Sequence, residues 1–224
     1  MSAAGLFAEL KRRCAADWDA YVRHDFVRRL GDGSLPEPCF AHYLKQDYLF
    51  LIHFARAYGL AAYKSTSLRD IRQAKDALAQ IVDVEIGLHV KFCAGWGISE
   101  DDLAQVPEEP ATLAYTRYVL ERGMAGTLLD LHVALAPCMI GYAEIATWLM
   151  AQNFTRLDGN PYREWIEMYA DPAYQAAATA EQAELDRLYE SDSGTGRLAD
   201  LGNTFGEATR LEIAFWQMGL SAAP

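Results

Sequence analysis

The sequence lacks the cysteine spacings that mark metal centres and disulfide frameworks. Its four cysteines, Cys14, Cys39, Cys93 and Cys138, are widely scattered, and no two of them form a CxxC or another short-spaced pair. Structural zinc sites and small disulfide-rich scaffolds depend on such spacings. We therefore expect reduced thiols, a cytoplasmic location and no bound metal or other cofactor.

Positive charge is also scarce. The chain carries 20 Lys and Arg against 31 Asp and Glu, for a net charge of -11. Nucleic-acid affinity rests on clustered Lys and Arg that neutralise backbone phosphates, and no dense basic stripe is present. A Gly-rich phosphate loop is missing as well. The sequence therefore argues against a nucleic-acid partner.

Long apolar runs and alternating strand patterns are the third absence. Nowhere do about 18 apolar residues follow one another without interruption, and the first 13 residues hold no long apolar run after a basic segment. No convincing β-type alternation, internal repeat or low-complexity tract is found. Because 51% of the 224 residues are apolar, we expect a single all-helical (all-α) domain over residues 1–224, with no membrane partner.

Apolar residues instead recur at helical spacing along most of the chain. Helices are expected over about residues 3–29, 36–63, 67–96, a short stretch ending at Gly123, 127–149, 162–170, 172–190 and 198–219. An acidic loop at 99–110, a turn-rich connection at 153–161 and a loop at 191–196 separate them.

Cys138 lies on the inward stripe of the helix expected over residues 127–149. The stripe is formed by residues at alternating steps of four and three, namely Leu131, Leu135, Cys138, Tyr142, Ile145 and Leu149. Pro137 cannot donate a backbone hydrogen bond, so a kink is expected one residue from the thiol. A lone cysteine in such a place is ordinarily a small buried core residue, and the other stripes must decide its role.

Two other helices each aim a carboxylate at the interior. Asp47 interrupts the apolar stripe from Phe40 to Tyr58, and Glu212 interrupts the stripe from Leu198 to Gly219. A buried carboxylate must be paired, neutralised, hydrogen-bonded or available for a ligand. Phe50, three residues after Asp47, is expected to supply an aromatic wall beside it.

The inward polar groups suit a flat ring that contains nitrogen. Carboxylates can hold or protonate ring nitrogens, and the phenols Tyr115, Tyr142 and Tyr169 can orient a water or the thiol. The pattern alone leaves two interpretations open, an active site and a hydrophobic core with paired polar groups. No histidine falls on the thiol's stripe; His53 and His132 are interpreted as structural or exposed, and Glu85 with His89 as an ordinary helix pair.

Several segments in this order carry a family resemblance. They are Tyr43-Leu-Lys-Gln-Asp47-Tyr-Leu-Phe50, Ala-Tyr115-Thr, Leu-Ala-Pro-Cys138-Met-Ile-Gly-Tyr142-Ala-Glu and Glu212-Ile-Ala-Phe-Trp216. Together they resemble the thiaminase II (TenA) family in its cysteine-bearing branch, and the similarity runs from about Leu6 to Leu220.

The resemblance implies a heme-oxygenase-like helical bundle, a homotetramer that binds no heme or metal. It implies hydrolysis of 4-amino-5-aminomethyl-2-methylpyrimidine, and more slowly of thiamine, to the hydroxymethyl compound in thiamine salvage. Cys138 would be the nucleophile, Asp47 and Tyr142 would hold ring nitrogens or the amino group, and Glu212 would transfer protons. Tyr115 and Tyr169 would lie near the thiol and water. Phe50 stands where the family commonly has tyrosine.

Two competing functions remain at this level. One is a regulator without catalysis that binds a pyrimidine or another protein on the same fold. The other, a metal-dependent oxidase, is disfavoured because the sequence has no Glu-x-x-His motifs on separate helices.

Overall fold

The computed structural model describes residues 5–192 and 196–222, and within them every regular element is helical. The elements are α1 (Gly5–Arg13), α2 (Ala15–Val22), α3 (Asp25–Asp32), α4 (Glu37–Lys64), α5 (Leu68–Ala79), η1 (Gln80–Glu85), α6 (Ile86–Gly95), α7 (Glu100–Ala104), α8 (Pro110–Ala125), α9 (Leu128–Met150), α10 (Arg163–Ala170), α11 (Pro172–Ser191) and α12 (Leu198–Leu220). The expected all-α class is confirmed.

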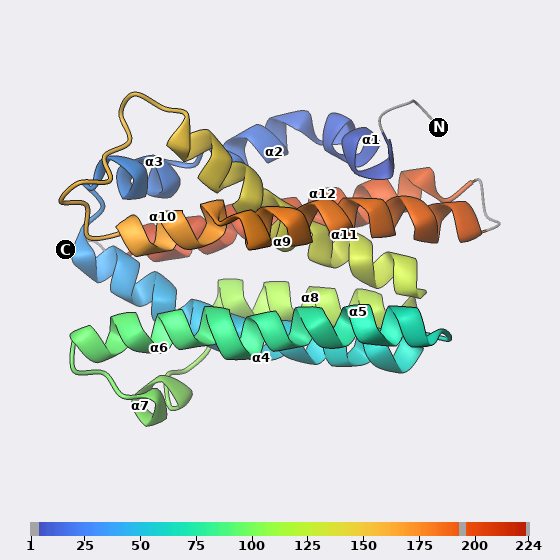
Figure 1. Cartoon of the computed structure of the whole chain (residues 1–224), viewed down its shortest axis with the longest axis horizontal. Helices are drawn as coiled ribbons and strands as arrows, with labels where there is room; N and C mark the ends of the chain where they lie inside the picture. Colours follow the sequence, from blue (N-terminus) through green and yellow to red (C-terminus); the bar gives the residue numbers. More distant parts are fainter. Residues whose placement is uncertain (1–4, 193–195, 223–224) are drawn as a thin grey trace.

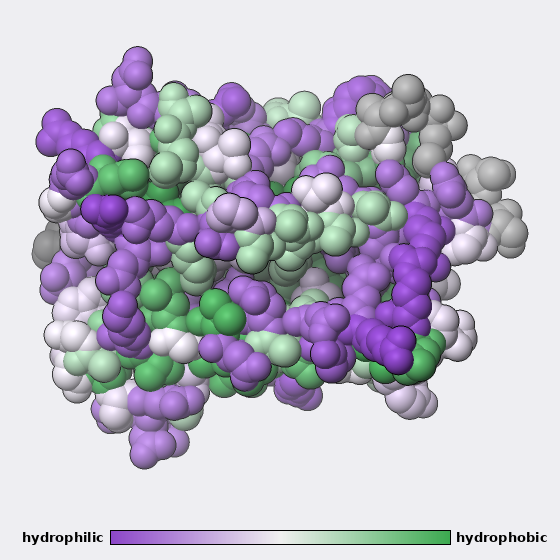
Figure 2. Space-filling model, viewed as in Figure 1, coloured by the Kyte–Doolittle hydropathy of each residue, from purple (hydrophilic) through white to green (hydrophobic). Residues whose placement is uncertain are grey.

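The helices form two rows with a long helix between them (Figure 1). α5 and α6 follow one another along α4, and α10 with α11 forms a second row beside them. α9 packs against α8, α10, α11 and α12, so it has neighbours on all sides. The face drawn in Figure 2 is mostly hydrophilic, with hydrophobic side chains gathered over parts of the two rows. The core therefore lies where α4, α9 and α12 meet.

α9 is buried along most of its length because of this central place. The helix starts with a capping box, in which Thr127 Oγ1 accepts from the Asp130 amide and the Asp130 carboxylate accepts from the Thr127 amide. By length and hydropathy α9 could also cross a membrane, but 78% of its most apolar window is buried inside the bundle. Its apolar character is therefore explained by its place in the core.

α9 continues through Pro137 without losing its helical assignment. The Tyr21 hydroxyl on α2 donates to the Pro137 carbonyl at 3.1 Å. The same ring lies against Gly141, where a Cβ atom would meet Tyr21 Cε1 at 2.4 Å. A side chain larger than hydrogen at residue 141 would therefore push α2 off the helix that carries Cys138. The expected kink at Pro137 stays a prediction.

Two expected elements are divided differently in the structure. Of the helix expected over residues 3–29, residues 3 and 4 lie outside the described part of the chain, and residues 5–29 form α1, α2 and part of α3, with breaks at Cys14 and at Arg23–His24. At the second break the His24 side chain accepts from the Phe26 amide and caps α3. The acidic segment expected as a loop contains α7, which begins with a Ser99–Asp102 capping box.

The helix expected over 67–96 contains a π-helical turn, η1, at its middle. A π turn holds an extra residue compared with an α turn, so it rotates the helix that follows relative to the helix that precedes. Glu85, at the end of this turn, and His89, on α6, are both buried. The interpretation of Glu85 and His89 as an ordinary helix pair was therefore wrong.

Candidate active site

Asp47 is held by a histidine and a tyrosine in the interior. Its Oδ2 atom lies 2.6 Å from His89 Nε2 and accepts a hydrogen bond from the Tyr43 hydroxyl at 2.8 Å. His89 is fully buried and Asp47 is 3% exposed. Asp47, on the apolar face of α4, is therefore paired with His89 from α6. The position of His89 depends on the π turn η1 that precedes α6.

The protonation of His89 follows from its two partners. Nδ1 lies 2.7 Å from the Glu85 carbonyl oxygen, which can only accept, so Nδ1 carries a proton. A second proton must lie between Nε2 and Asp47. Burial lowers the pKa of His89, but the hydrogen bond and charge of Asp47 outweigh it and the pKa is raised. The pair is therefore an imidazolium beside a carboxylate, with no net charge.

Glu212 on α12 is buried against a phenol from α8. The Tyr115 hydroxyl donates to Glu212 Oε1 at 2.9 Å, and both residues are 1% exposed. Burial raises the pKa of Glu212 to about 8, with the Tyr115 hydrogen bond opposing and the Asp47 charge adding to the rise. A carboxyl group with a pKa near neutrality can both donate and accept a proton under ordinary conditions.

Cys138 shares this environment. Burial raises the pKa of its thiol well above the usual value, and the charges of Glu212, Glu85 and Asp47 raise it further. The three carboxyl groups are therefore close enough to act on the sulfur, although they come from three different helices. The thiol is protonated at neutral pH, and its nucleophilic form requires a base or a cationic ligand.

Aromatic rings line the remaining sides. Phe50 packs on Tyr115 with ring centroids 4.9 Å apart, and Tyr142 packs on Tyr169 at the same separation. Both Tyr142 and Tyr169 feel the charge of Asp47, which follows burial as a cause of their raised pKa values. The seven residues singled out from sequence are therefore all buried in one region of the core.

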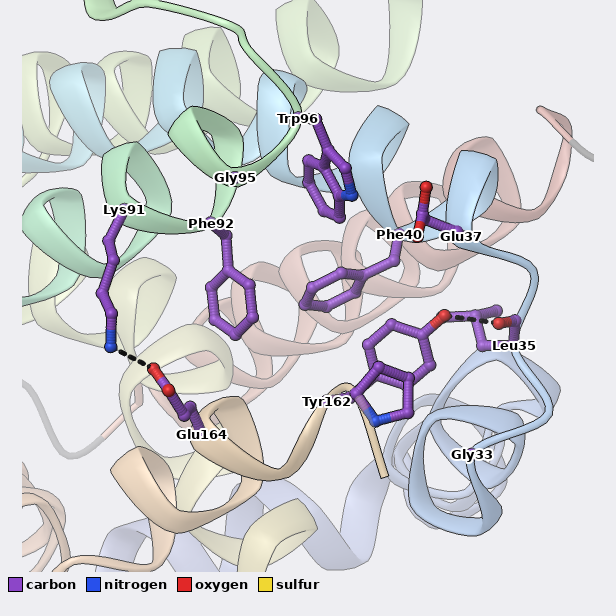
Figure 3. Close-up of a pocket in the computed structure, with 11 residues that line it drawn as sticks. Gly33, Leu35, Glu37, Phe40, Lys91, Phe92, Gly95, Trp96, Tyr162 and Glu164 are labelled. Atoms are coloured by element: carbon purple, nitrogen blue, oxygen red, sulfur yellow. Dashed lines mark hydrogen bonds and ion pairs between the residues drawn. The ribbon is translucent and has the colours of Figure 1, made fainter. Parts of the chain in front are cut away.

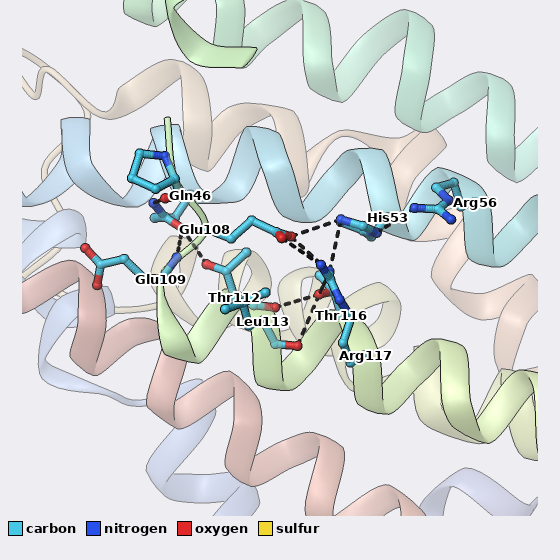
Figure 4. Close-up of polar contacts among 10 residues, drawn as sticks. Gln46, His53, Arg56, Glu108, Glu109, Thr112, Leu113, Thr116 and Arg117 are labelled. Atoms are coloured by element: carbon cyan, nitrogen blue, oxygen red, sulfur yellow. Dashed lines mark hydrogen bonds and ion pairs between the residues drawn. The ribbon is translucent and has the colours of Figure 1, made fainter. Parts of the chain in front are cut away.

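A polar cluster joins α4 to α8, the helix that carries Tyr115 (Figure 4). The Gln46 side chain, next to Asp47, accepts from the Glu109 amide and the Thr112 hydroxyl. Glu108 bridges Arg117 and His53 a little further along the same two helices. His53 thus has a structural role, as does His132, which is buried and pairs with Glu181 at 2.6 Å.

A separate aromatic pocket lies behind Asp47, at the ends of α4 and α6 (Figure 3). It has a volume of about 450 Å³ and is lined by the rings of Phe40, Phe92, Trp96 and Tyr162. None of the seven predicted residues lines it. Its Phe40 ring lies 6.0 Å from the ring of Tyr43, the residue that hydrogen-bonds Asp47, so the wall of this pocket packs against a partner of Asp47.

Sequence reasoning missed five residues of this region. Besides Glu85 and His89, they are the buried phenols Tyr43, Tyr58 and Tyr174. The spacing of four between Tyr43 and Asp47 could have indicated their contact. Tyr58 and Tyr174 are recognised only in the folded chain, where the Cys138 and Glu85 charges act on both. Among the described residues, no group of three or more His, Cys, Asp or Glu side chains is arranged to hold a metal ion.

The chain is similar to several known proteins over most of its length. An uncharacterized protein of Haemophilus influenzae is 41% identical over 218 residues, covering 97% of this chain and 100% of that protein. The aminopyrimidine aminohydrolase of Halalkalibacterium halodurans is 34% identical over 212 residues, covering 94% of this chain and 93% of that protein.

Solved structures agree with the fold. A crystal structure of a TenA family transcription regulator from Silicibacter sp. TM1040 superposes with a TM-score of 0.91, at 41% identity over 96% of each chain. A domain with a heme oxygenase-like fold from Shewanella denitrificans OS217 superposes with a TM-score of 0.72 at 16% identity, over 96% of this chain and 92% of that one. The expected heme-oxygenase-like bundle is therefore confirmed.

A family model covers nearly the whole chain as well. It matches residues 12–222, a range that includes every buried acid, thiol and phenol described above. Family, fold and the shared length of these relatives all agree with the resemblance seen in the sequence. The chain belongs to the TENA/THI-4/PQQC family.

Proposed function

We propose that the chain is an aminopyrimidine aminohydrolase of the thiaminase II type. It would convert 4-amino-5-aminomethyl-2-methylpyrimidine, and more slowly thiamine, to the hydroxymethyl compound for thiamine salvage. The observation that carries the proposal is the burial in one core of Cys138 and two inward carboxyl groups, Asp47 held by His89 at 2.6 Å and Glu212 held by Tyr115 at 2.9 Å. Relatives named aminopyrimidine aminohydrolase support it. A cytoplasmic homotetramer is part of the same proposal.

Binding of the ring uses the groups around Asp47. The Asp47 carboxylate, which lies 2.6 Å from His89 Nε2, accepts from the exocyclic amine or a protonated ring nitrogen. Tyr142 hydrogen-bonds another ring nitrogen, and the rings of Phe50 and Tyr169 flank the heterocycle. Binding of a cationic ring is favoured, because its positive charge compensates the buried carboxylates for the hydration that they lack.

The reaction exchanges an amine for a hydroxyl group at the methylene carbon. The Cys138 sulfur bonds to a ring carbon, the methylene C–N bond breaks, and the leaving amine takes a proton from Glu212. Water then adds to the exocyclic methylene and returns a proton to Glu212, and the C–S bond breaks to restore the ring. The Tyr115 hydroxyl, hydrogen-bonded to Glu212 Oε1, holds this carboxyl group in place between the two transfers.

In the first step the thiol gives its proton to the Glu212 carboxylate, which passes it to the leaving amine, and the thiolate recovers a proton from Glu212 when the C–S bond breaks. A cationic substrate lowers the pKa of the Cys138 thiol and of the nearby carboxyl groups, because it offsets the negative charge that had raised them. The substrate thus helps to form the thiolate that attacks it. Without a ligand, the Cys138 thiol therefore stays protonated and unreactive.

We expect stability to fall as pH rises from about 5 to 8, and less so in Glu212→Gln. Burial raises the pKa values of Glu212 and Glu85 from 4.5 to about 8. Their contribution is fully present below pH 4.5 and is lost as pH rises through 8, since the unfolded chain releases these protons earlier. Each group contributes a slope of about 1.4 kcal/mol per pH unit in that window. Urea unfolding at several pH values measures it.

The exposed Glu190→Gln variant is the matched control for this measurement. Its unfolding free energy should run parallel to that of the wild type at every pH. The unfolding free energy of Glu212→Gln should instead fall less steeply with pH than that of the wild type, by the contribution of one titrating group. Equal slopes in all three proteins would show that Glu212 is already ionised in the folded state, and that it cannot donate a proton to the leaving amine.

A regulator without catalysis is the second candidate, and one solved relative is described as a transcription regulator. The net charge of -11 opposes direct binding to DNA phosphates. A mobility-shift assay at physiological salt distinguishes the two functions. Tight, sequence-dependent binding together with no turnover of the aminomethylpyrimidine would favour the regulator.

A further inference from the structure

A second pocket opens between the two helical rows, and Met139 of α9 lines it. It has a volume of about 640 Å³, within the range of small-molecule sites, and it lies between α5 with η1 on one side and α11 on the other. In Figures 1 and 2 these elements form the front rows of the molecule. α9 contributes Met139, the residue after Cys138, to its wall. The pocket therefore reaches the helix that carries the proposed nucleophile, one residue along the chain from it.

Tyr58 forms a polar point in this pocket. The side chain lines the pocket, is 2% exposed, and its hydroxyl has no hydrogen-bond partner among the described residues. An unpaired buried hydroxyl costs about 1–3 kcal/mol, which a ligand acceptor or donor would recover. The Tyr58 ring packs on Phe54 with centroids 5.7 Å apart, and Phe54 packs on Phe50 at 5.2 Å. Tyr58 is thus joined by ring contacts to the aromatic wall of the proposed active site.

Small side chains create the space itself. Ala77 on α5 and Ala173, Ala177 and Ala180 on α11 line the pocket. Buried Glu181 also lines it, and its carboxylate is already paired with His132 at 2.6 Å. Gln73, Gln80 and Asp76 also line the pocket, and the Asp76 carboxylate is paired with Lys75. On its alanine side, therefore, the pocket presents methyl groups to a ligand. An apolar segment of a ligand fits this part of the pocket.

An arginine without a partner stands at the mouth. Arg72 lines the pocket, is exposed, and forms no ion pair in residues 5–192 and 196–222. Its neighbour Arg69 is bound to Glu184 at 2.9 Å. In a chain with a net charge of -11, an unpaired guanidinium beside a pocket attracts a carboxylate or phosphate to that place.

We infer that this pocket is the leaving-group subsite, and that the enzyme accepts aminopyrimidines whose departing amine carries an apolar chain with an anionic end. The inference rests on the proposed function. The methylene C–N bond breaks, the departing amine takes a proton, and water supplies the hydroxyl group, as for the unsubstituted amine. Tyr58 hydrogen-bonds the amine nitrogen or a polar group beside it, the alanines contact the chain, and Arg72 binds the anion.

Three synthetic substrates test the subsite. They are 4-amino-5-aminomethyl-2-methylpyrimidine and its N-butyl and N-(3-carboxypropyl) derivatives. In the wild type we expect a KM about three- to fivefold lower for the carboxypropyl than for the butyl compound, since Arg72 is exposed and solvent screens its attraction for the carboxylate. A phosphonate analogue of the same length shows whether the two anions are equivalent. Equal KM values for the butyl and carboxypropyl compounds would overturn the anionic part of the inference.

Two variants with matched controls locate the effect. Arg72→Gln should remove the preference for the carboxypropyl compound, and Ala177→Leu should raise the KM of both derivatives, while neither changes turnover of the unsubstituted amine. Arg56→Gln, on an exposed part of α4, and Ala176→Leu, on the exposed side of α11, should behave as wild type. An Ala177→Leu variant that loses activity on all three compounds alike would contradict a separate subsite.

Calorimetric binding keeps this test independent of the proposed reaction. If the wild type releases no ammonia from the aminomethylpyrimidine, the proposed function fails. The subsite is then judged by binding of the carboxypropyl compound alone, which Arg72→Gln and Ala177→Leu should weaken and Arg56→Gln should not. Unchanged affinity in all variants would reject the subsite.

Discussion

Replacing Cys138 with serine is expected to abolish release of ammonia from 4-amino-5-aminomethyl-2-methylpyrimidine while the protein stays folded. A serine hydroxyl ionises far less readily than a thiol, and the carboxyl groups that raise the pKa of Cys138 would oppose an alkoxide even more strongly. Loss of a covalent nucleophile should lower kcat/KM by at least about a thousandfold. An ammonia assay with circular dichroism of the same samples measures both properties.

Cys14→Ser is the matched control for this substitution. Cys14 lies between α1 and α2, where its thiol donates to the Leu10 carbonyl, and a serine hydroxyl can form the same bond. This variant should retain full turnover. Wild-type turnover in Cys138→Ser would refute covalent catalysis by this cysteine and leave Glu212 and Asp47 as a site for direct attack by water.

Replacing His89 with leucine is expected to destabilise the fold by about 3–5 kcal/mol, because it leaves the Asp47 carboxylate buried without its cationic partner. Tyr43 alone would remain to hydrogen-bond it. Urea unfolding near neutral pH measures the loss. Turnover should fall as well, since His89 no longer orients the Asp47 carboxyl group toward the exocyclic amine or a protonated ring nitrogen.

The double variant Asp47→Asn, His89→Leu separates stability from chemistry. Removing both charges should restore most of the unfolding free energy, because no uncompensated ion is left in the core. Activity should stay absent. A single His89→Leu variant as stable as the wild type would show that Asp47 is solvated or neutral in the folded protein.

The positions of Asp47, Cys138 and Glu212 could be predicted because each lies on an unbroken α-helix. In α4, α9 and α12 the steps of three and four residues hold from end to end, so one polar residue on an apolar stripe must point inward. Which helices face one another is not encoded in that period. The sequence therefore could not predict the hydrogen bond between Tyr115 on α8 and Glu212 on α12. It indicates Tyr115 only as a phenol near the thiol.

Helix ends were predictable where a local signal marks them. Gly33 ends α3 in the left-handed conformation, and Thr127 caps α9, as their residue types favour. The break at Cys14 carries no such signal, because neither glycine nor proline interrupts the spacing of Leu6, Leu10 and Trp18. Tertiary packing sets that break, and sequence periodicity cannot show it.

The π turn at Gln80–Glu85 makes the position of His89 a matter of residue count. The same residues wound as a regular α-helix from Leu68 to Gly95 would have better backbone hydrogen bonds. That regular helix would, however, turn His89 by about 100° relative to its present direction, since an α-helix has 3.6 residues per turn. The imidazole would then face away from Asp47. The extra residue held in the π turn therefore keeps His89 on the Asp47 side, and deleting one residue of the turn would straighten the helix while leaving the imidazole in place.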